Sequence, residues 1–268
     1  MTNKTVKILS PVLNNNKLVW PIIVNGRKDE VVLEFSSNVR QFVVIDRIDS
    51  LVAGLLIFCI RNGFDIESEM PITDEFLYNL THHFIPAVAG TAHKPKITSH
   101  VITPLPSEGN IIATGISCGV DSLYTIATHS DADLSACNLT HLAFFDAGSN
   151  HSDKGPSKTK DGRRALARRF AKKYNYGFIE INSNLPEFIE RNSGTGYSHV
   201  ENHTFMMLHC VLSIAKGMHK YYYSSGYGYS GFDCKYKPTG NYDASHYDLL
   251  TLSLASYGDL NFKSTGGQ

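Results

Sequence analysis

Closely paired cysteines are missing from this chain. Its cysteines are Cys59, Cys118, Cys137, Cys210 and Cys234, and no two of them stand in a Cys-x-x-Cys arrangement. Such pairs are the usual sequence sign of structural zinc sites and redox dithiols, and small secreted domains show regularly spaced cysteines instead. The sequence therefore indicates neither a zinc site nor a disulfide framework, and we expect a protein of the reducing cytoplasm.

An excess of charge and a long apolar run are also absent. Lys+Arg and Asp+Glu number 25 each, so the chain lacks the positive field that nonspecific nucleic-acid binding needs. The most apolar stretch, residues 51–60, is too short to cross a bilayer, and residues 1–4 carry no apolar signal segment. Because 42% of the residues are hydrophobic, we expect a globular protein with a substantial core and with neither membrane nor nucleic acid as a partner.

The first part of the chain has the pattern of a small α+β module, which we place at residues 1–106. Residues 17–24 and 30–35 favour two strands joined through Asn25-Gly26, a hairpin turn signal. We expect further strands at 43–45 and 64–67, a helix over 49–62 ended by Gly63, and a helix capped by Thr73 that buries Phe76, Leu77, Leu80 and Phe84. Residues 89–98 have the composition of a linker.

From Asn110 onward strands and helices alternate, which is typical of an α/β domain with a parallel sheet. We place this domain at residues 107–268. The pattern predicts strands beginning at 111, 142, 178 and 221, and helices over 163–176, 199–218 and 247–257. Since the sequence given ends just after a further apparent strand, we expect either a missing C-terminal part or a partner, a second copy included, that completes it.

The residues best suited to bind a ligand lie where the strand that begins at Ile111 is followed by small residues. A strand that breaks into a Gly/Ser loop and opens a helix directs free N–H groups and the positive end of the helix dipole toward one point, which suits phosphate. Ser117 and Ser122 can add hydroxyl donors, and Asp121 can hold Mg²⁺ or cap the helix. The segment is neither a Walker loop nor a dinucleotide-binding Gly-x-Gly-x-x-Gly.

The order Ser-Cys-Gly-Val-Asp-Ser over residues 117–122 resembles the Ser-Gly-Gly-x-Asp-Ser signature of the PP-loop ATP pyrophosphatase superfamily. It departs from that signature at Cys118, which stands where the family usually has its first glycine. The resemblance implies a doubly wound, HUP/Rossmann-like nucleotide-binding domain that takes ATP and Mg²⁺, splits ATP between the α and β phosphates, and holds the pyrophosphate on this loop.

Within the superfamily the chain is most similar to the branch that includes 7-cyano-7-deazaguanine synthase, although it lacks that branch's cysteine-rich zinc site near the C-terminus. The resemblance implies a small-molecule or nucleobase-like substrate. It also places adenine and ribose after the second strand of the domain and a Gly-containing turn after the fourth strand. The expected ATP-binding residues are Ser117, Cys118, Gly119, Val120, Asp121, Ser122, Phe145, Asp146, Ser225 and Gly226, with Ser117 and Asp121 catalytic and Asp121 on the metal.

Other polar features allow two interpretations each. His199 and His203 lie four apart on one face of an expected helix, where a polar cluster facing the substrate is favoured over a metal site. Cys118 is either a nucleophile, since a helix N-terminus lowers thiol pKa, or simply a small loop residue. The basic residues of 163–173 indicate a solvated helix face rather than a nucleic-acid surface, and Tyr221, Tyr222 and Tyr223 indicate packing rather than base stacking.

Three functions fit these observations. The first is an enzyme that adenylates a carboxylate or carbonyl oxygen, after which a nitrogen nucleophile displaces AMP. The second is a degenerate PP-loop domain that binds nucleotide, or nothing, as a subunit of a complex, which the Cys118 departure favours. The third is a sulfur transferase with Cys118 or Cys234 as the persulfide carrier, against which the absence of paired cysteines argues.

Overall fold

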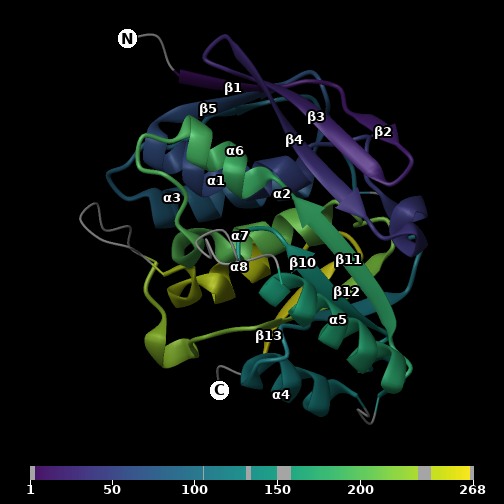
Figure 1. The fold of residues 1–268 in the computed structure, drawn as a ribbon. Helices are drawn as coiled ribbons and strands as arrows, with labels where there is room; N and C mark the ends of the chain where they lie inside the picture. The colour runs from purple at the N-terminus through teal and green to yellow at the C-terminus, as the bar shows by residue number, and fades with distance from the viewer. Residues whose placement is uncertain (1–3, 105, 131–133, 150–157, 235–242, 266–268) are drawn as a thin grey trace.

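The computed structural model describes residues 4–104, 106–130, 134–149, 158–234 and 243–265. Of residues 158–160 it describes the backbone alone. Its centre is a mixed, largely parallel sheet flanked by helices (Figure 1). In spatial order the strands are β13 (Asn261–Thr265), β12 (Met218–Ser224), β9 (Ile111–Gly115), β10 (His141–Asp146), β11 (Gly177–Ser183), β4 (Arg27–Phe35), β3 (Lys17–Val24), β1 (Lys4–Ile8), β5 (Phe64–Ser68) and β7 (Ile97–Thr98), and β2 (Val12–Asn14) pairs with β3. The expected α/β class is thereby confirmed.

The helices and the remaining strands complete the described chain. The helices are α1 (Asp49–Asn62), α2 (Asp74–Asn79), α3 (Ile85–Ala89), α4 (Val120–His129), α5 (Lys158–Lys173), α6 (Leu185–Asn192), α7 (His199–Leu212) and α8 (Asp248–Ala255). Short 3₁₀ turns cover Ser37–Phe42, Ser135–Cys137, Tyr229–Gly231 and Ala244–His246, and a π turn, Leu80–Phe84, joins α2 to α3. β6 (Ile72–Thr73) and β8 (Val101–Ile102) form a separate pair. No helix within the described ranges is long and apolar enough to cross a membrane.

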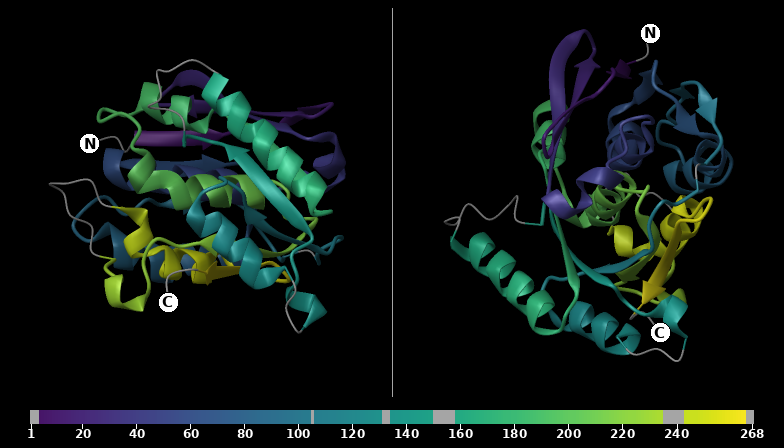
Figure 2. Two further views of the ribbon diagram at one scale, coloured as in Figure 1. Left: turned by 60° about the horizontal axis from the view of Figure 1, so that its bottom comes forward. Right: turned by 90° about the vertical axis from the view of Figure 1, so that its right-hand side faces the viewer.

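The five strands β13-β12-β9-β10-β11 run parallel to one another. Along the chain, β9, β10 and β11 extend the sheet in one direction, whereas β12 and β13 extend it in the other, so the strand order reverses at β9. α4 and α5 pack on one face of these strands, and α7 and α8 pack on the other face (Figure 2). In such sheets ligands bind beyond the carboxyl ends of the strands, next to the point of reversal.

The side chains of the parallel strands alternate between the two faces and build two cores. Ile112, Leu142, Phe144 and Tyr222 pack with α4 and α5. On the opposite face, the residues that pack against the larger core include Ile111, Ala113, Ala143, Phe145, Tyr221 and Tyr223. Tyr221 and Tyr223 therefore lie on one face of the sheet and Tyr222 on the other, as strand alternation requires.

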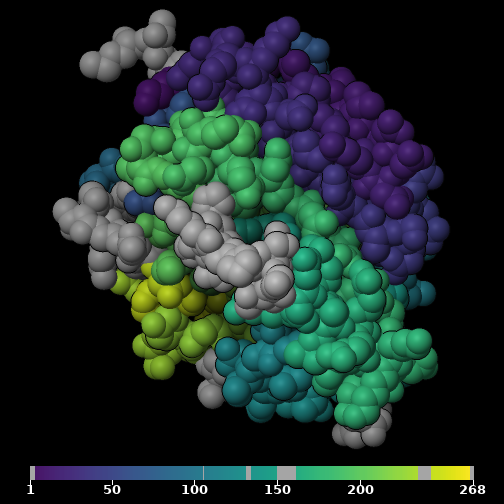
Figure 3. All heavy atoms as spheres, in the orientation of Figure 1, coloured from purple at the N-terminus to yellow at the C-terminus, as the bar shows by residue number. Residues whose placement is uncertain are grey.

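The N-terminal residues continue the same sheet. β3 and β4 form the expected hairpin, with Asn25 (φ 48°) and Gly26 (φ 81°) in the left-handed conformation that a tight hairpin turn requires. β4 then pairs antiparallel with β11, so that Phe35 lies opposite Ile181. In the space-filling view the purple N-terminal strands and the green α6 form a continuous surface (Figure 3). The expected boundary at 106/107 falls between β8 and β9, and one sheet spans both sides of it.

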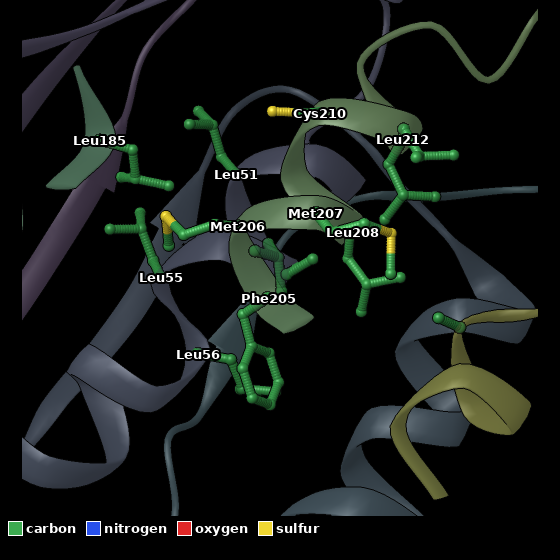
Figure 4. Packing of buried hydrophobic residues seen from close by; sticks show 14 of the residues in the cluster. Leu51, Leu55, Leu56, Leu185, Phe205, Met206, Met207, Leu208, Cys210 and Leu212 are labelled. Carbon is green, nitrogen blue, oxygen red and sulfur yellow. The ribbon is translucent and has the colours of Figure 1, made fainter. Parts of the chain in front are cut away.

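The packing of α1 against α7 joins the two parts of the chain in one core. Both helices are buried over nearly their whole length. Figure 4 shows Leu51 and Leu55 of α1 beside Met206 and Cys210 of α7, with Leu185 of α6 next to them. A Cβ at Gly54 would lie 3.1 Å from His209 Cβ, so glycine permits the close approach of the two helices.

Several expectations about single elements were wrong. Residues 43–45 are not a strand: they form a loop after a 3₁₀ turn, in which Val43 and Val44 are buried, Ile45 is exposed, and Val44 N–H donates to Ser213 O. Thr73 is the N-cap residue of α2, as expected, but its hydroxyl donates to Asp49 and not to the helix. The helix expected over 199–218 ends at Leu212. β7 lies within the expected linker, and β1, β8 and α6 were not foreseen. Residues 266–268, which follow the last strand, lie outside the described ranges.

Candidate functional site

The segment between β9 and α4 forms a tight loop at the point where the strand order reverses. β9 ends at Gly115, Ile116 N–H donates to Ala143 O of β10, and α4 begins at Val120. Cys118 lies in the left-handed region with φ 61°, whereas Gly119 is extended (φ −87°, ψ 171°) and occupies the N-cap position of α4. The position at which the family signature has glycine thus has the backbone conformation that glycine adopts at least cost.

The strain at Cys118 is unusual within the described part of the chain. The other non-glycine residues with positive φ are Asn15, Asn25 and Asn175, and asparagine is the residue that best tolerates this region after glycine. For cysteine the left-handed conformation costs roughly 1–2 kcal/mol. The thiol packs half-buried against the α4/α5 core, and burial raises its pKa, which disfavours a nucleophilic thiolate.

Hydrogen bonds within the loop hold both serine hydroxyls in place. Gly119 N–H donates to Ser117 Oγ at 3.2 Å, and Ser122 Oγ donates to Gly119 O at 2.9 Å. The two serine hydroxyls lie 3.2 Å apart. The first N–H groups of α4 have no partner within the helix, and the helix dipole adds positive potential there. Asp121, in the first turn of α4, is exposed.

A cavity of about 330 Å³ opens beside this loop, at the carboxyl ends of β9, β10 and β12. That volume lies within the range of small-molecule sites. The residues lining it are Gly115, Ile116, Ser117, Asp121, Ser122, Ala143, Phe144, Phe145, Ser149, Arg163, Met207, Tyr221, Tyr223 and Ser224. Of the residues expected at the site, Ser117, Asp121, Ser122 and Phe145 line the cavity, and Cys118, Gly119 and Val120 complete the loop beside it.

Aromatic rings form one wall of the cavity. Phe145 at the end of β10 lies parallel to Tyr221 of β12, with 6.1 Å between ring centroids and 20° between ring planes. Tyr223 follows on the same face. Packing was expected of these tyrosines, and the structure adds that two of them face the cavity.

Asp146 lies behind the cavity wall and does not line it. Its carboxylate is 3.5 Å from Arg164 Nη2, and Arg164 also contacts Glu180 Oε1 at 2.9 Å. To bind a ribose as expected, Asp146 would have to give up its ion pair with Arg164. Through Asp146 and Glu180, Arg164 ties α5 to the end of β10 and to β11. Two residues of the polar turn after β10, Asn150 and His151, lie outside the described ranges.

The basic helix α5 contributes more than a solvated face. Arg163 is exposed, as expected, but it also lines the cavity, and Arg164 is partly buried and pairs with Asp146. The buried stripe expected at Ala165, Leu166, Phe170 and Ala171 is confirmed only at its last two residues. Ala167 and Ala171 are buried with Phe170 packed beside them, whereas Leu166 is exposed.

Ser225 and Gly226, which follow β12 and were expected at the site, do not line the cavity. Ser225 is buried, with its N–H donating to Thr265 O and its hydroxyl accepting from Ser264 Oγ at 2.6 Å. Gly226 packs next to Ser245. Ser224, the preceding residue, lines the cavity instead and lies 2.9 Å from Thr125 Oγ1 of α4.

A polar cluster lies next to Tyr223, where α7 meets the 3₁₀ turn at Ala244–His246. His203 Nδ1 is 2.6 Å from Tyr223 Oη, and His203 Nε2 is 3.1 Å from Asp243 Oδ1. His199, one turn earlier, lies 3.2 Å from Tyr197 Oη, and burial lowers its pKa to about 4. Among the residues that the structure describes, no three His, Cys, Asp or Glu side chains gather as a metal site, so the histidine pair belongs to a hydrogen-bonded cluster.

No protein-family model matches this chain, and neither a curated protein nor a solved structure matches it. The functional interpretation therefore depends on the loop, the cavity and their chemistry.

Proposed function

We propose that this protein is an ATP-dependent enzyme of the PP-loop type that forms AMP and pyrophosphate, built on a doubly wound, HUP/Rossmann-like sheet. The observation that carries the proposal is the conformation of the loop. Its six-residue motif follows a strand at the reversal of strand order, adopts positive φ at the family's glycine position, and opens into a cavity. A backbone of this shape at a helix N-terminus suits a phosphate chain.

The lining residues fit the parts of Mg-ATP. The first N–H groups of α4, the hydroxyl of Ser117 and the guanidinium of Arg163 suit the phosphates. Asp121 is an exposed carboxylate at the loop, and Mg²⁺ commonly takes one or two carboxylates together with phosphate oxygens. Phe145 and Tyr221 offer an apolar wall to the adenine. Bound Mg²⁺ would neutralise the charge on the departing pyrophosphate.

The proposed reaction adenylates a carboxylate or carbonyl oxygen of a small-molecule or nucleobase-like substrate. That oxygen forms a bond to the α-phosphorus, and the bond from this phosphorus to the bridging oxygen breaks as pyrophosphate leaves. A nitrogen nucleophile then attacks the activated carbon and AMP departs. Such a reaction depends on alignment and charge stabilisation, which the loop supplies.

Product identity tests this proposal. The protein is incubated with Mg²⁺, ATP labelled at the α-phosphate, ammonium and a panel of heterocyclic carboxylic acids. We expect labelled AMP together with pyrophosphate, and a strong loss of both in Asp121→Asn. Formation of ADP instead of AMP, or no turnover with any acid, would overturn the assignment.

A catalytically degenerate domain is the second candidate, and the non-glycine residue at a left-handed position favours it. Binding without turnover would support that role. Sulfur transfer is less well supported, because burial raises the pKa of the Cys118 thiol.

A further inference from the structure

The cluster at His203 has the bonding pattern of a proton relay. The carboxylate of Asp243 accepts, so His203 Nε2 carries the hydrogen that points at Asp243 Oδ1, 3.1 Å away. Nδ1 of the neutral ring is then an acceptor, and the Tyr223 hydroxyl donates to it at 2.6 Å. A carboxylate, an imidazole and a hydroxyl joined in this order are the arrangement by which enzymes activate a hydroxyl.

The surroundings favour an ionised Asp243 and a protonated Tyr223. Burial works to raise the pKa of Asp243, but hydrogen bonds from Ser245 and His203 outweigh it, so the pKa is lowered and the carboxylate stays ionised. Burial raises the pKa of Tyr223, with the charges of Asp248 and Asp243 adding to the effect. Because a free phenolate is disfavoured, Tyr223 can lose its proton only as it gains another.

The relay reaches the same cavity as the phosphate loop. The hydroxyl of Tyr221 lies against Gly115, where an added Cβ would be 3.1 Å from it. Tyr223 is two residues further along β12 on the same face, which brings it to the level of the loop. Both Tyr223 and Asp121 line the cavity, and Ser224 Oγ donates to Asp121 O at 3.4 Å.

A purely structural network would be expected deeper in the core. The side chains of His203 and Asp243 remain 21% and 34% exposed, respectively, and Tyr223, which bonds to His203, connects them to the cavity. By contrast, His209 of the same helix is fully buried among serines. The partial exposure of His203 and Asp243 gives the relay a route for releasing a proton to solvent.

We propose that Tyr223, His203 and Asp243 form the proton relay that deprotonates the nitrogen nucleophile of the second half-reaction, an inference that rests on the proposed function. As the nitrogen forms its bond to the activated carbon, its proton passes to Tyr223 Oη, and the phenolic proton passes to His203 Nδ1. The bond from that carbon to the AMP oxygen breaks, and AMP leaves with the electron pair. Asp243 stabilises the imidazolium that results.

The test separates nucleotide binding from proton transfer. Tyr223→Phe, His203→Asn and Asp243→Asn are compared with wild type and with Tyr229→Phe, which changes an exposed tyrosine outside the cavity. Titration with Mg-ATP gives the Kd, and release of labelled AMP in the presence of an ammonium salt, which supplies ammonia as the nucleophile, gives the rate. We expect an unchanged Kd in all variants, a rate lowered roughly 100-fold in Tyr223→Phe and His203→Asn, and a wild-type rate in Tyr229→Phe.

Each outcome has a distinct meaning. Normal ATP binding with unaltered AMP release in Tyr223→Phe overturns the relay alone. Failure of wild type to bind Mg-ATP overturns the proposed function and, with it, the role given to the relay. Nitrogen NMR of labelled histidine gives a readout independent of activity: we expect His203 to carry its proton on Nε2, and a proton on Nδ1 instead contradicts the relay.

Discussion

At the scale of the residue, Cys118 is the position at which the loop departs from the signature that it resembles. Cysteine stands where that signature has glycine, and φ at this residue is 61°. The thiol gains contact with the α4/α5 core in return. Strain held at a functional loop is common in binding sites and is tolerated because the surrounding structure enforces it.

Substitution of Cys118 measures that strain. Cys118→Gly and Cys118→Ala both remove the thiol, but only alanine keeps a Cβ at positive φ. We expect the glycine variant to be more stable than the alanine variant by about 1 kcal/mol in the free energy of unfolding by urea. Equal stability of the two variants would show that the loop relaxes out of the left-handed conformation.

The structure brings expected site residues together at the cavity where their position depends on their neighbours in the chain. Ser117, Asp121 and Ser122 line the cavity because one local motif brings them together. Arg163 and Tyr223 come from other elements, and their position depends on helix register and strand pairing, which no local pattern reveals. That Ser224 lines the cavity and Ser225 does not has the same cause, since strand alternation decides which of the two faces the cavity.

At the scale of the element, the contact between α1 and α7 determines how the two parts of the chain assemble. His209 lies at its centre, with Nδ1 2.9 Å from Ser50 Oγ and 3.1 Å from Ser50 O, and with Nε2 3.1 Å from Ser183 Oγ. These contacts satisfy a neutral ring that links α1, α7 and β11. Burial lowers the pKa of His209 to about 4.

That shift predicts a pH dependence of stability. Between pH 6.5 and about 4 the unfolded chain binds a proton at His209 that the folded protein does not, so stability falls as the pH falls through this window. The full effect is about 3 kcal/mol. We expect the difference in unfolding free energy between wild type and His209→Gln to shrink from pH 7.5 to pH 4.5. Wild type and His209→Gln share all other titrating groups. A difference in unfolding free energy that stays constant with pH would therefore contradict a buried neutral imidazole at His209.

Gly54 tests the closeness of the same helices. A Cβ there would lie 2.4 Å from Leu185 Cδ2 and 3.1 Å from His209 Cβ. We expect Gly54→Ala to lower the unfolding free energy by about 1–3 kcal/mol despite the better helix propensity of alanine. Gly162→Ala in α5, where a Cβ meets nothing within 4 Å, is the matched control and should be neutral or stabilising. A stabilising Gly54→Ala would show that the helices are further apart.

The sequence predicted elements well where turn chemistry or a glycine marked their ends, as with the β3–β4 hairpin and with α1, which ends at Gly63 (φ 75°). It failed at residues 43–45, because a short apolar run is equally compatible with a strand and with a buried loop. The buried stripe of α5 was misplaced at Leu166, which is exposed, because Ala167, which is buried instead, carries little hydrophobic signal.

At the scale of the whole molecule, a single sheet spans both sides of the boundary that the sequence suggested. The change in composition near Pro106 is real, but β4 adds antiparallel to β11 and α1 covers α7. Pairing between strands so distant in sequence is not encoded in any local pattern.

Deletion of residues 1–106 tests this assembly. It would remove α1 from the apolar face of α7. It would also remove β4, so that β11 would become an edge strand of the sheet. We expect the remaining residues, 107–268, to lack a cooperative unfolding transition and to bind an apolar dye. Cooperative unfolding of that piece would instead show a self-sufficient domain.

The most direct test of the central claim is calorimetric titration with Mg-ATP. Wild type is compared with Asp121→Ala and with Asp74→Ala, which removes an exposed acid from the first turn of α2 as a control. We expect micromolar binding by wild type and by Asp74→Ala, with affinity lowered by at least about tenfold in Asp121→Ala. Absence of binding by wild type, or equal affinity in Asp121→Ala, would contradict it.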